Sequence, residues 1–334
     1  MFYKIKIFIF HLCKMLGLFW ISRVIYKKDL RILCYHGFTL KKEHEFLPGL
    51  FIEPEVFAQR MQYLADKKYK VITLQEAYEL KEARNFPDDG IVITIDDGFY
   101  SVLKSLPILK KHNFPATLYV TSYYFDKNAP IFMLAVKYMF FKTTANNASL
   151  KRLEIDGLSS QEDKDAVKKI INRGFALKNE DERVLLLRRL GECLDIDYDE
   201  LNDSRILNLI NGSEIEEFLK NDVDIQLHTH RHTFPEIAEV AAKEIQQNKD
   251  KINPLLPYDM DHFCYPSGVW SEKQWPVLEQ NKILTATTCE PRLVNYDTPN
   301  LALDRILDST RVSQIEFEAE VSGFNQIIRL LRNK

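Results

Sequence analysis

Short runs of β-branched and apolar residues alternate with helical segments along most of the chain. One such run is Gly90–Asp96, GIVITID, and the segments on both sides of it show helical spacing of apolar residues. Repeated strand–helix units form a parallel sheet or a barrel. We therefore predict an α/β fold. The other expected strands lie at residues 31–37, 70–73, 115–121, 222–228, 262–266 and 283–288.

Residues 130–220 interrupt this alternation with a stretch that is mostly helical in pattern. We interpret it as a helical insertion between two strands. Several helix starts are predicted from a Ser, Thr or Asn followed three residues later by Glu, which is the pattern of a capping box. The pairs are Ser159 with Glu162, Asn179 with Glu182, Ser213 with Glu216, Thr73 with Glu76, and Thr233 with Glu236.

Residues 1–29 form a separate N-terminal segment, with six basic residues and no acid before Asp29. The charges leave no apolar run of roughly 18 residues, which disfavours a spanning helix. The segment also lacks a small-residue cleavage site, which disfavours a cleaved signal peptide. Apolar residues recur at helical spacing. Two interpretations stay open: a basic amphipathic helix in peripheral contact with an anionic membrane through residues 1–28, or a helix packed on the flank of the domain.

The apolar residues that follow this helical spacing are Phe8, Leu12, Met15 and Phe19. Residues 30–310 are expected to form the main α/β unit, and residues 311–334 a helical tail.

Net charge and cysteine content limit the binding partners and the cellular compartment that we expect for this protein. The net charge is −3, so the basic excess of a nucleic-acid-binding protein is missing. The five cysteines are scattered and odd in number, which argues against a disulfide framework and favours a reducing compartment. A cytoplasmic or membrane-surface location is therefore favoured, while an exported or membrane-anchored location stays open.

Polar residues follow several of the expected strands. Asp96 and Asp97 follow the run at 91–95, His36 follows the first strand, and a histidine cluster, HTHRH, follows the strand at 222–227. In parallel sheets and barrels, chemistry collects where the strands end. These residues are therefore the candidates for a functional site.

The HTHRH cluster predicts a metal site. His228 and His232 are four residues apart, and His228 with His230 is also a usable pair. Two imidazoles and one carboxylate make a three-ligand site that leaves a position open for water. The alternative is a polar loop with surface histidines.

The adjacent carboxylates at Asp96 and Asp97 can serve one site in two ways. One can bind a cation while the other accepts a proton from the activated water. The alternative is a turn, because Asp-Gly favours turns. The triplet Asp-Asp-Gly also occurs in PDDGI at 87–91, where no strand precedes it and the turn is preferred.

Four motifs together resemble those of the polysaccharide deacetylases, the NodB-homology or carbohydrate esterase family 4. TIDDGFYS is similar to the family's TFDDG motif, HTHRH to H-[ST]-x-x-H, and FCYPSG to its third motif. ILCYHG resembles the opening strand of the exopolysaccharide-deacetylase branch. The resemblance spans Arg31–Thr310 and implies a deformed (β/α)7 barrel, here with a helical insertion.

The resemblance also implies roles for individual residues. Asp96 would be the general base. Asp97, His228 and His232 would bind a divalent metal, zinc foremost, with cobalt, manganese or nickel as alternatives. Tyr265 and Pro266 would line the substrate groove, with a backbone amide near Tyr265 helping to hold the oxyanion. The reaction would remove the N-acetyl group of an amino sugar in a polysaccharide or a lipid-linked glycan.

Two departures from the family pattern concern catalysis. The arginine that opens the third motif in many members is missing, and Arg305 is the candidate substitute, with a surface salt bridge as the alternative. No histidine follows His262, so the late general acid of many members is missing too. His36 is the candidate for an active-site role, with a hydrogen-bonded core histidine as the alternative.

Three rival functions remain at this point. A glycosyltransferase would use the two carboxylates to hold a nucleotide-sugar cation, which leaves the histidines unexplained. A catalytically inactive carbohydrate-binding protein on the same fold would explain the missing late histidine. An amidohydrolase would use HTH as an HxH pair, but that pair normally lies on the first barrel strand.

Overall fold

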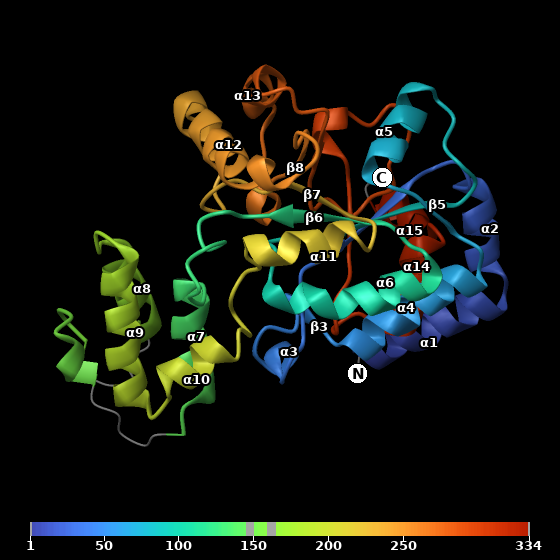
Figure 1. The fold of residues 1–334 in the computed structure, drawn as a ribbon. Coiled ribbons are helices and arrows are strands. Elements are labelled where there is room, and N and C mark those ends of the chain that lie inside the picture. Colours follow the sequence, from blue (N-terminus) through green and yellow to red (C-terminus); the bar gives the residue numbers. More distant parts are fainter. Residues whose placement is uncertain (1, 145–149, 159–164, 333–334) are drawn as a thin grey trace.

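The computed structural model describes residues 2–144, 150–158 and 165–332. Its centre is a curled parallel sheet with the strand order β10–β1–β5–β6–β7–β8–β9 (Figure 1). This topology confirms the predicted α/β fold of the deformed (β/α)7 type. The strands are β1 (Arg31–Tyr35), β5 (Gly90–Ile95), β6 (Ala116–Val120), β7 (Val223–Leu227), β8 (His262–Cys264), β9 (Thr285–Thr287) and β10 (Ile306–Leu307).

The two edges of the curled sheet approach each other at Leu303. A parallel bridge joins Thr287 in β9 to Leu303, whose N–H donates to the carbonyl of Ala286 at 2.8 Å. The same segment continues into β10, which pairs with β1. A further short strand, β4 (Lys70–Val71), pairs with the start of β5. A separate two-stranded sheet consists of β2 (Gly37–Phe38) and β3 (Phe51–Ile52).

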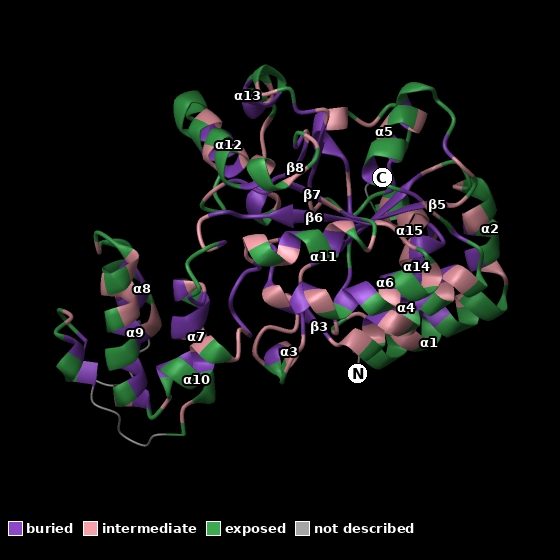
Figure 2. Cartoon of the chain, viewed as in Figure 1, coloured by how far each residue is buried: buried purple, intermediate pink, exposed green. Residues whose placement is uncertain are grey.

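Amphipathic helices cover the outside of the sheet. In α4 the apolar residues at helical spacing, Phe57, Met61 and Leu64, form one stripe that is fully buried. Figure 2 shows the same division into buried and exposed faces along the other covering helices. The covering helices are α4 (Pro54–Asp66), α5 (Leu74–Glu82), α6 (Leu106–His112), α12 (Ala238–Ile252) and α13 (Trp275–Gln280), while the short α3 (Glu43–Phe46) contacts β3 of the two-stranded sheet.

The predicted helix starts have mixed outcomes. Thr73 caps α5 as expected, since its side chain accepts from the N–H of Glu76. The start at Thr233 is wrong, because α12 begins at Ala238. The N–H of Thr233 donates instead to the Thr229 hydroxyl at 3.2 Å, which keeps Thr233 in the histidine loop.

The stretch at 130–220 is helical where the structure describes it. Asn179 caps α9 as predicted, but the capping box expected at Ser213 lies two residues earlier, at Asn211 and Glu214. Glu214 is held there by an ion pair with Arg205. The pair Ser159 and Glu162 lies outside the described residues. The helices are α7 (Phe132–Lys142), α8 (Ala166–Phe175), α9 (Glu180–Leu194), α10 (Tyr198–Asp203) and α11 (Ile215–Leu219).

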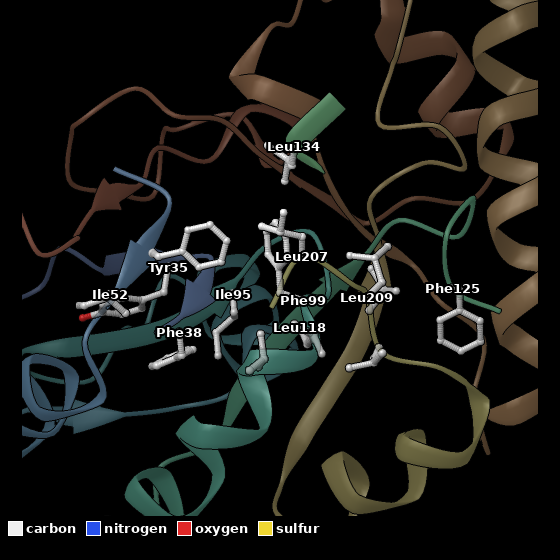
Figure 3. Close-up of a cluster of buried hydrophobic side chains, with 14 of the residues drawn as sticks. Tyr35, Phe38, Ile52, Ile95, Phe99, Leu118, Phe125, Leu134, Leu207 and Leu209 are labelled. Carbon is white, nitrogen blue, oxygen red and sulfur yellow. The ribbon is translucent and has the colours of Figure 1, made fainter. Parts of the chain in front are cut away.

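The end of this helical stretch is bonded to the loop that follows β5. The N–H of Ile210 donates to Gly98, and the N–H of Tyr100 donates to Asn208, both at 2.9 Å. Apolar side chains pack around this junction (Figure 3). Those labelled there include Tyr35, Ile95, Phe99, Leu118, Leu134, Leu207 and Leu209. The insertion is therefore anchored next to the Asp-Asp-Gly turn.

The N-terminal segment forms two helices, α1 (Phe2–Met15) and α2 (Leu18–Ile25), which pack on α14 (Gln314–Val321) and α15 (Phe324–Arg332). Gly17, with φ of 76°, separates them, so the single helix expected through Phe19 is wrong. Within the described part of the chain, no single helix has the length and apolarity to cross a membrane. The pair α1 and α2 meets that test together, with a bend of 72°.

The packing of α8 on α7 depends on Gly174. A Cβ at this position would clash with the ring of Phe132, which is fully buried. We therefore expect Gly174→Ala to lower the free energy of unfolding by about 1–3 kcal/mol through overpacking, measured by urea unfolding. Gly49→Ala is the control, because a Cβ there has no atom within 4 Å. Equal effects of the two substitutions would contradict this packing argument.

Candidate active site

The polar residues predicted to form a site meet at the carboxyl ends of the strands. Residues Arg31–Tyr35 of β1 pair in register with Ile91–Ile95 of β5, so His36 and Asp96 lie on neighbouring strand ends. Residue His228 follows β7 directly. The strand-end rule therefore identified residues that lie together.

Backbone conformation separates the two adjacent carboxylates. Asp97 has φ of 72° and Gly98 has φ of 82°, so the chain turns sharply after Asp96. A Cβ on Gly98 would lie 3.0 Å from the Val120 side chain, which together with its φ makes glycine necessary here. Consequently Asp96 and Asp97 reach different partners.

Asp97 lies between two histidines. Its Oδ1 is 3.2 Å from His228 Nε2 and 3.3 Å from His232 Nε2, and the three candidate ligand atoms lie within 4.8 Å of one another. His228 is buried, and its Nδ1 donates to the carbonyl of Cys264 at 2.9 Å. That bond leaves Nε2 free to act as a ligand. His232 is more open, with 42% of its side chain exposed.

The third histidine of the cluster does not join this group. His230 Nδ1 is hydrogen-bonded to Ser122 Oγ at 2.9 Å, and its carbonyl accepts from Tyr123. Of the two pairs left open by the sequence, His228 with His232 is the one that converges on Asp97.

The atoms around Asp97 fit a bound cation. Asp97 Oδ1 is buried, and although the Nε2 atoms of His228 and His232 lie 3.2 and 3.3 Å away, neither contact has hydrogen-bond geometry; such a carboxylate oxygen is costly to bury unless a cation lies beside it. Burial by itself raises the pKa of Asp97, but the rings of His228 and His232 lower it well below its usual value. The group is therefore ionised at neutral pH, and two nitrogens with one oxygen suit zinc.

Asp96 is held by a buried arginine. Both carboxylate oxygens accept from Arg305, at 2.7 Å each, and Arg305 also donates to the carbonyl of Thr288 and to the Thr94 hydroxyl. Arg305 is fully buried, so the alternative of a surface salt bridge is wrong. Burial raises the pKa of Asp96, but the charge and hydrogen bonds of Arg305 outweigh it and hold that pKa well below its usual value.

Two cysteines and one histidine complete the surroundings of Asp96. The thiols of Cys34 and Cys264 donate to Asp96 Oδ2 at 3.5 and 3.4 Å, and sequence reasoning missed both. Their positions at the ends of β1 and β8 were the available signal. His36 Nε2 lies 3.8 Å from the same oxygen, and its side chain is 19% exposed. His36 thus lies at the rim of the group.

The structure does not place Tyr265 in a groove. Its ring is fully buried against Phe263 and Phe234, and its hydroxyl donates to the carbonyl of Leu301 at 2.9 Å. Its N–H donates to Thr287, which extends the pairing of β8 with β9 and turns the ring into the core. The adjacent Pro266 is buried too. Neither residue lines the cavity described next.

A cavity of about 480 Å³ opens beside Asp97 and His232. Its remaining walls come largely from the insertion and from the segment after β6, and they are mainly aromatic and apolar. Tyr123 and Tyr124, which follow β6, were missed, although they too sit at a strand end. The other lining residues are Leu50, Phe99, Thr121, Ile131, Met133, Leu134, Phe175, Arg183, His230 and Arg231.

Substitution of Arg305 tests the electrostatic contribution of the Asp96–Arg305 pair to stability. We expect Arg305→Met to lower the free energy of unfolding by about 3–5 kcal/mol at pH 7, because a buried charge loses its partner. Without Arg305, burial places the pKa of Asp96 above its value in the unfolded chain. Ionised Asp96 then destabilises the variant only at pH values above the pKa of this group in the unfolded chain. The loss of unfolding free energy relative to the parent therefore becomes smaller towards pH 4.

Denaturant unfolding at pH 7 and pH 4.5 measures this difference. Arg84→Met is the matched control, because the Arg84–Asp297 pair is exposed and should change stability by only about 0.5 kcal/mol. A deficit for Arg305→Met that stays the same at both pH values would contradict the linkage to Asp96.

Comparisons with known proteins concern the fold and one segment of the chain. Residues 201–286, which include the histidine cluster and the third motif, match the family model for polysaccharide deacetylase. No curated protein sequence matches the chain.

Three solved structures illustrate the similarity of fold. The Streptococcus pyogenes deacetylase PplD in complex with acetate is 17% identical with a TM-score of 0.59, covering 88% of this chain and 98% of that one. IcaB from Ammonifex degensii is 17% identical with a TM-score of 0.54, covering 88% and 97%. The de-N-acetylase from Aggregatibacter actinomycetemcomitans is 13% identical with a TM-score of 0.57, covering 87% and 99%.

At these identities the structural similarity supports the fold alone, and the segment matched by the family model contains two of the four motifs, HTHRH and FCYPSG. Together they confirm the predicted resemblance to the polysaccharide deacetylases, a family of hydrolases that act on carbon–nitrogen bonds other than peptide bonds.

Proposed function

We propose that the protein is a metal-dependent deacetylase that hydrolyses the N-acetyl group of an amino sugar. The observation that carries this proposal is the convergence of Asp97, His228 and His232 within ligand distance of one ion, next to Asp96. The description of one structural neighbour as a deacetylase in complex with acetate supports acetate as the product.

Asp97, His228 and His232 would hold the cation. A divalent ion there, zinc by its donor set, would polarise the amide carbonyl and acidify a water molecule. The Cys264 carbonyl and the Asn248 side chain position His228, through its Nδ1 and its backbone N–H respectively. The ring orientation is therefore fixed before any ion binds.

Asp96 would act as the base that accepts the proton of the attacking water. Oδ2 of Asp96 accepts from Arg305 and from the thiols of Cys34 and Cys264, whereas Oδ1 accepts from Arg305 and keeps one lone pair that would take the proton. The arginine makes Asp96 a weaker base and also fixes its position. His36, 3.8 Å from Asp96, is the nearest imidazole to that carboxylate outside the proposed ligands and would supply a proton to the departing amine.

The substrate would enter the cavity between the barrel and the insertion. Tyr123 and Phe175 offer ring faces for a sugar, and Arg183 donates to the Tyr123 hydroxyl at 2.8 Å and fixes that ring. An N-acetylated sugar in a polysaccharide or a lipid-linked glycan fits such a mixed lining. The proposal therefore assigns recognition to the insertion rather than to Tyr265 and Pro266.

The rival functions have less support than the proposed deacetylase. A glycosyltransferase would use both carboxylates to hold one cation, whereas both oxygens of Asp96 are bonded to Arg305 and Asp97 is the carboxylate that pairs with both His228 and His232. An inactive carbohydrate-binding protein differs from the proposed enzyme in a single measurable quantity, the release of acetate.

Asp96→Asn tests the assignment of the base. We expect the variant to retain the parent's metal content and to release acetate from N-acetylated amino-sugar oligomers about 10²–10⁴ times more slowly, because the proton acceptor is lost. Asp88→Asn is the control, since Asp88 belongs to the other Asp-Asp-Gly triplet and is exposed. Acetate release by Asp96→Asn at the parent rate would exclude Asp96 as the base.

Metal analysis tests the ligands independently of turnover. We expect Asp97→Asn and His232→Ala to lower zinc affinity by more than about 100-fold, which exceeds the usual effect of losing a supporting residue. His230→Ala should bind zinc like the parent, because that imidazole is bonded to Ser122. Competition with a chromophoric chelator measures all three affinities, and equal losses in the three variants would argue against this ligand set.

A further inference from the structure

The N-terminal helices carry an unusual share of exposed apolar surface. Of the 22 large apolar side chains that are exposed among the described residues, 11 lie between residues 3 and 25. We call these 11 residues the N-terminal apolar face. They are Tyr3, Ile5, Phe8, Ile9, Leu12, Met15, Leu16, Trp20, Ile21, Val24 and Ile25.

On α1 this surface follows the helical repeat. Ile5, Phe8, Leu12 and Met15 are spaced by three or four residues and therefore share one side of the helix. Phe10 lies on the opposite side and is buried with Phe19 and Ile315. One face of the segment therefore packs on the domain, as one of the two interpretations expected, and the other face is apolar and exposed.

The exposed face is flanked by basic groups. No acid occurs before Asp29, and the side chains of Lys6 and Lys14 remain 53% and 44% exposed although they pair with Glu316 and Glu318. Lys27 and Lys28 are likewise half exposed. Figure 2 shows exposed residues along the outer sides of both α1 and α2.

We propose that the N-terminal apolar face docks on an anionic lipid surface, with α1 and α2 lying in the interface. Apolar helices flanked by lysine, with the rings of Phe8 and Trp20 exposed, match what the boundary between headgroups and acyl chains accommodates. A second copy of the chain fits less well, because a self-complementary contact would bring two lysine-flanked faces together.

The contacts that α2 and the residues after it make with the rest of the chain set the orientation of the docked protein. Arg23 pairs with Asp89, and Lys28 donates to the carbonyl of Phe86, so α2 is tied to the chain just before the amino end of β5. Asp96 and Asp97 follow the carboxyl end of that strand. The docked protein therefore directs its cavity away from the lipid and towards the water.

Vesicle flotation tests docking without any substrate. The full chain should float with phosphatidylglycerol-containing vesicles, and Phe8→Glu/Leu12→Glu should weaken this binding roughly tenfold or more, since charge is placed in the apolar face. Leu185→Glu/Val240→Glu is the matched control, because Leu185 and Val240 are exposed apolar residues outside the N-terminal apolar face. Lys4→Gln should weaken binding about fivefold at low salt.

The native tryptophans test the orientation. Brominated lipids should quench Trp20, and Trp20→Phe should abolish the quenching, because Trp270 and Trp275 stack near Tyr265 at the carboxyl end of β8. Quenching that survives in Trp20→Phe would overturn the orientation.

Three results would overturn the docking itself. These are failure of the full chain to float, equal flotation of Phe8→Glu/Leu12→Glu and the parent, and a dimer broken by that double variant without vesicle binding. The third result would assign the face to a second copy. None of these readouts depends on deacetylase activity.

Discussion

The buried pair of Asp96 and Arg305 joins the closing of the sheet to the organisation of the site. Arg305 precedes β10, the strand that returns to β1, and its guanidinium reaches Asp96 at the end of β5 with two bonds of 2.7 Å. A buried charge in such a position is tolerable only when its partner is present. The closing segment therefore cannot move without removing the counter-ion of the proposed base.

The pairing of Asp96 with Arg305 also explains why two adjacent carboxylates do not bind the same partner. With Asp96 committed to Arg305, the positive φ of Asp97 and Gly98 turns the second carboxylate towards the histidines. The next residues then bond to the end of the insertion, at Asn208 and Ile210. One short loop thus positions both Asp97, the proposed metal ligand, and the part of the insertion that forms the far wall of the cavity.

Local sequence patterns predicted those features of the structure that depend on residues close together in the sequence. The strands, the stripe on α4 and the Thr73 cap follow from periodicity and short-range hydrogen bonds, and strand-end polarity identified Asp97 with the histidines. Contacts between distant segments could not be predicted this way. The burial of Tyr265 depends on the pairing of β8 with β9, and the cavity depends on where α7, α8 and α9 of the insertion lie relative to the strand ends.

The position of Arg305 shows why the missing family arginine does not by itself argue against catalysis. Side chains from several strands point into the end of a barrel, so a counter-charge can come from any strand whose side chain reaches the base. Arg305 meets that condition from the segment before β10, and the third motif contributes the Cys264 thiol, which contacts both Asp96 and Arg305. The same reasoning applies to His36 at the end of β1, because in-register pairing with β5 brings it beside Asp96. What the chemistry requires is a charge and a proton donor at that carboxylate, and the fold allows each to come from a different strand.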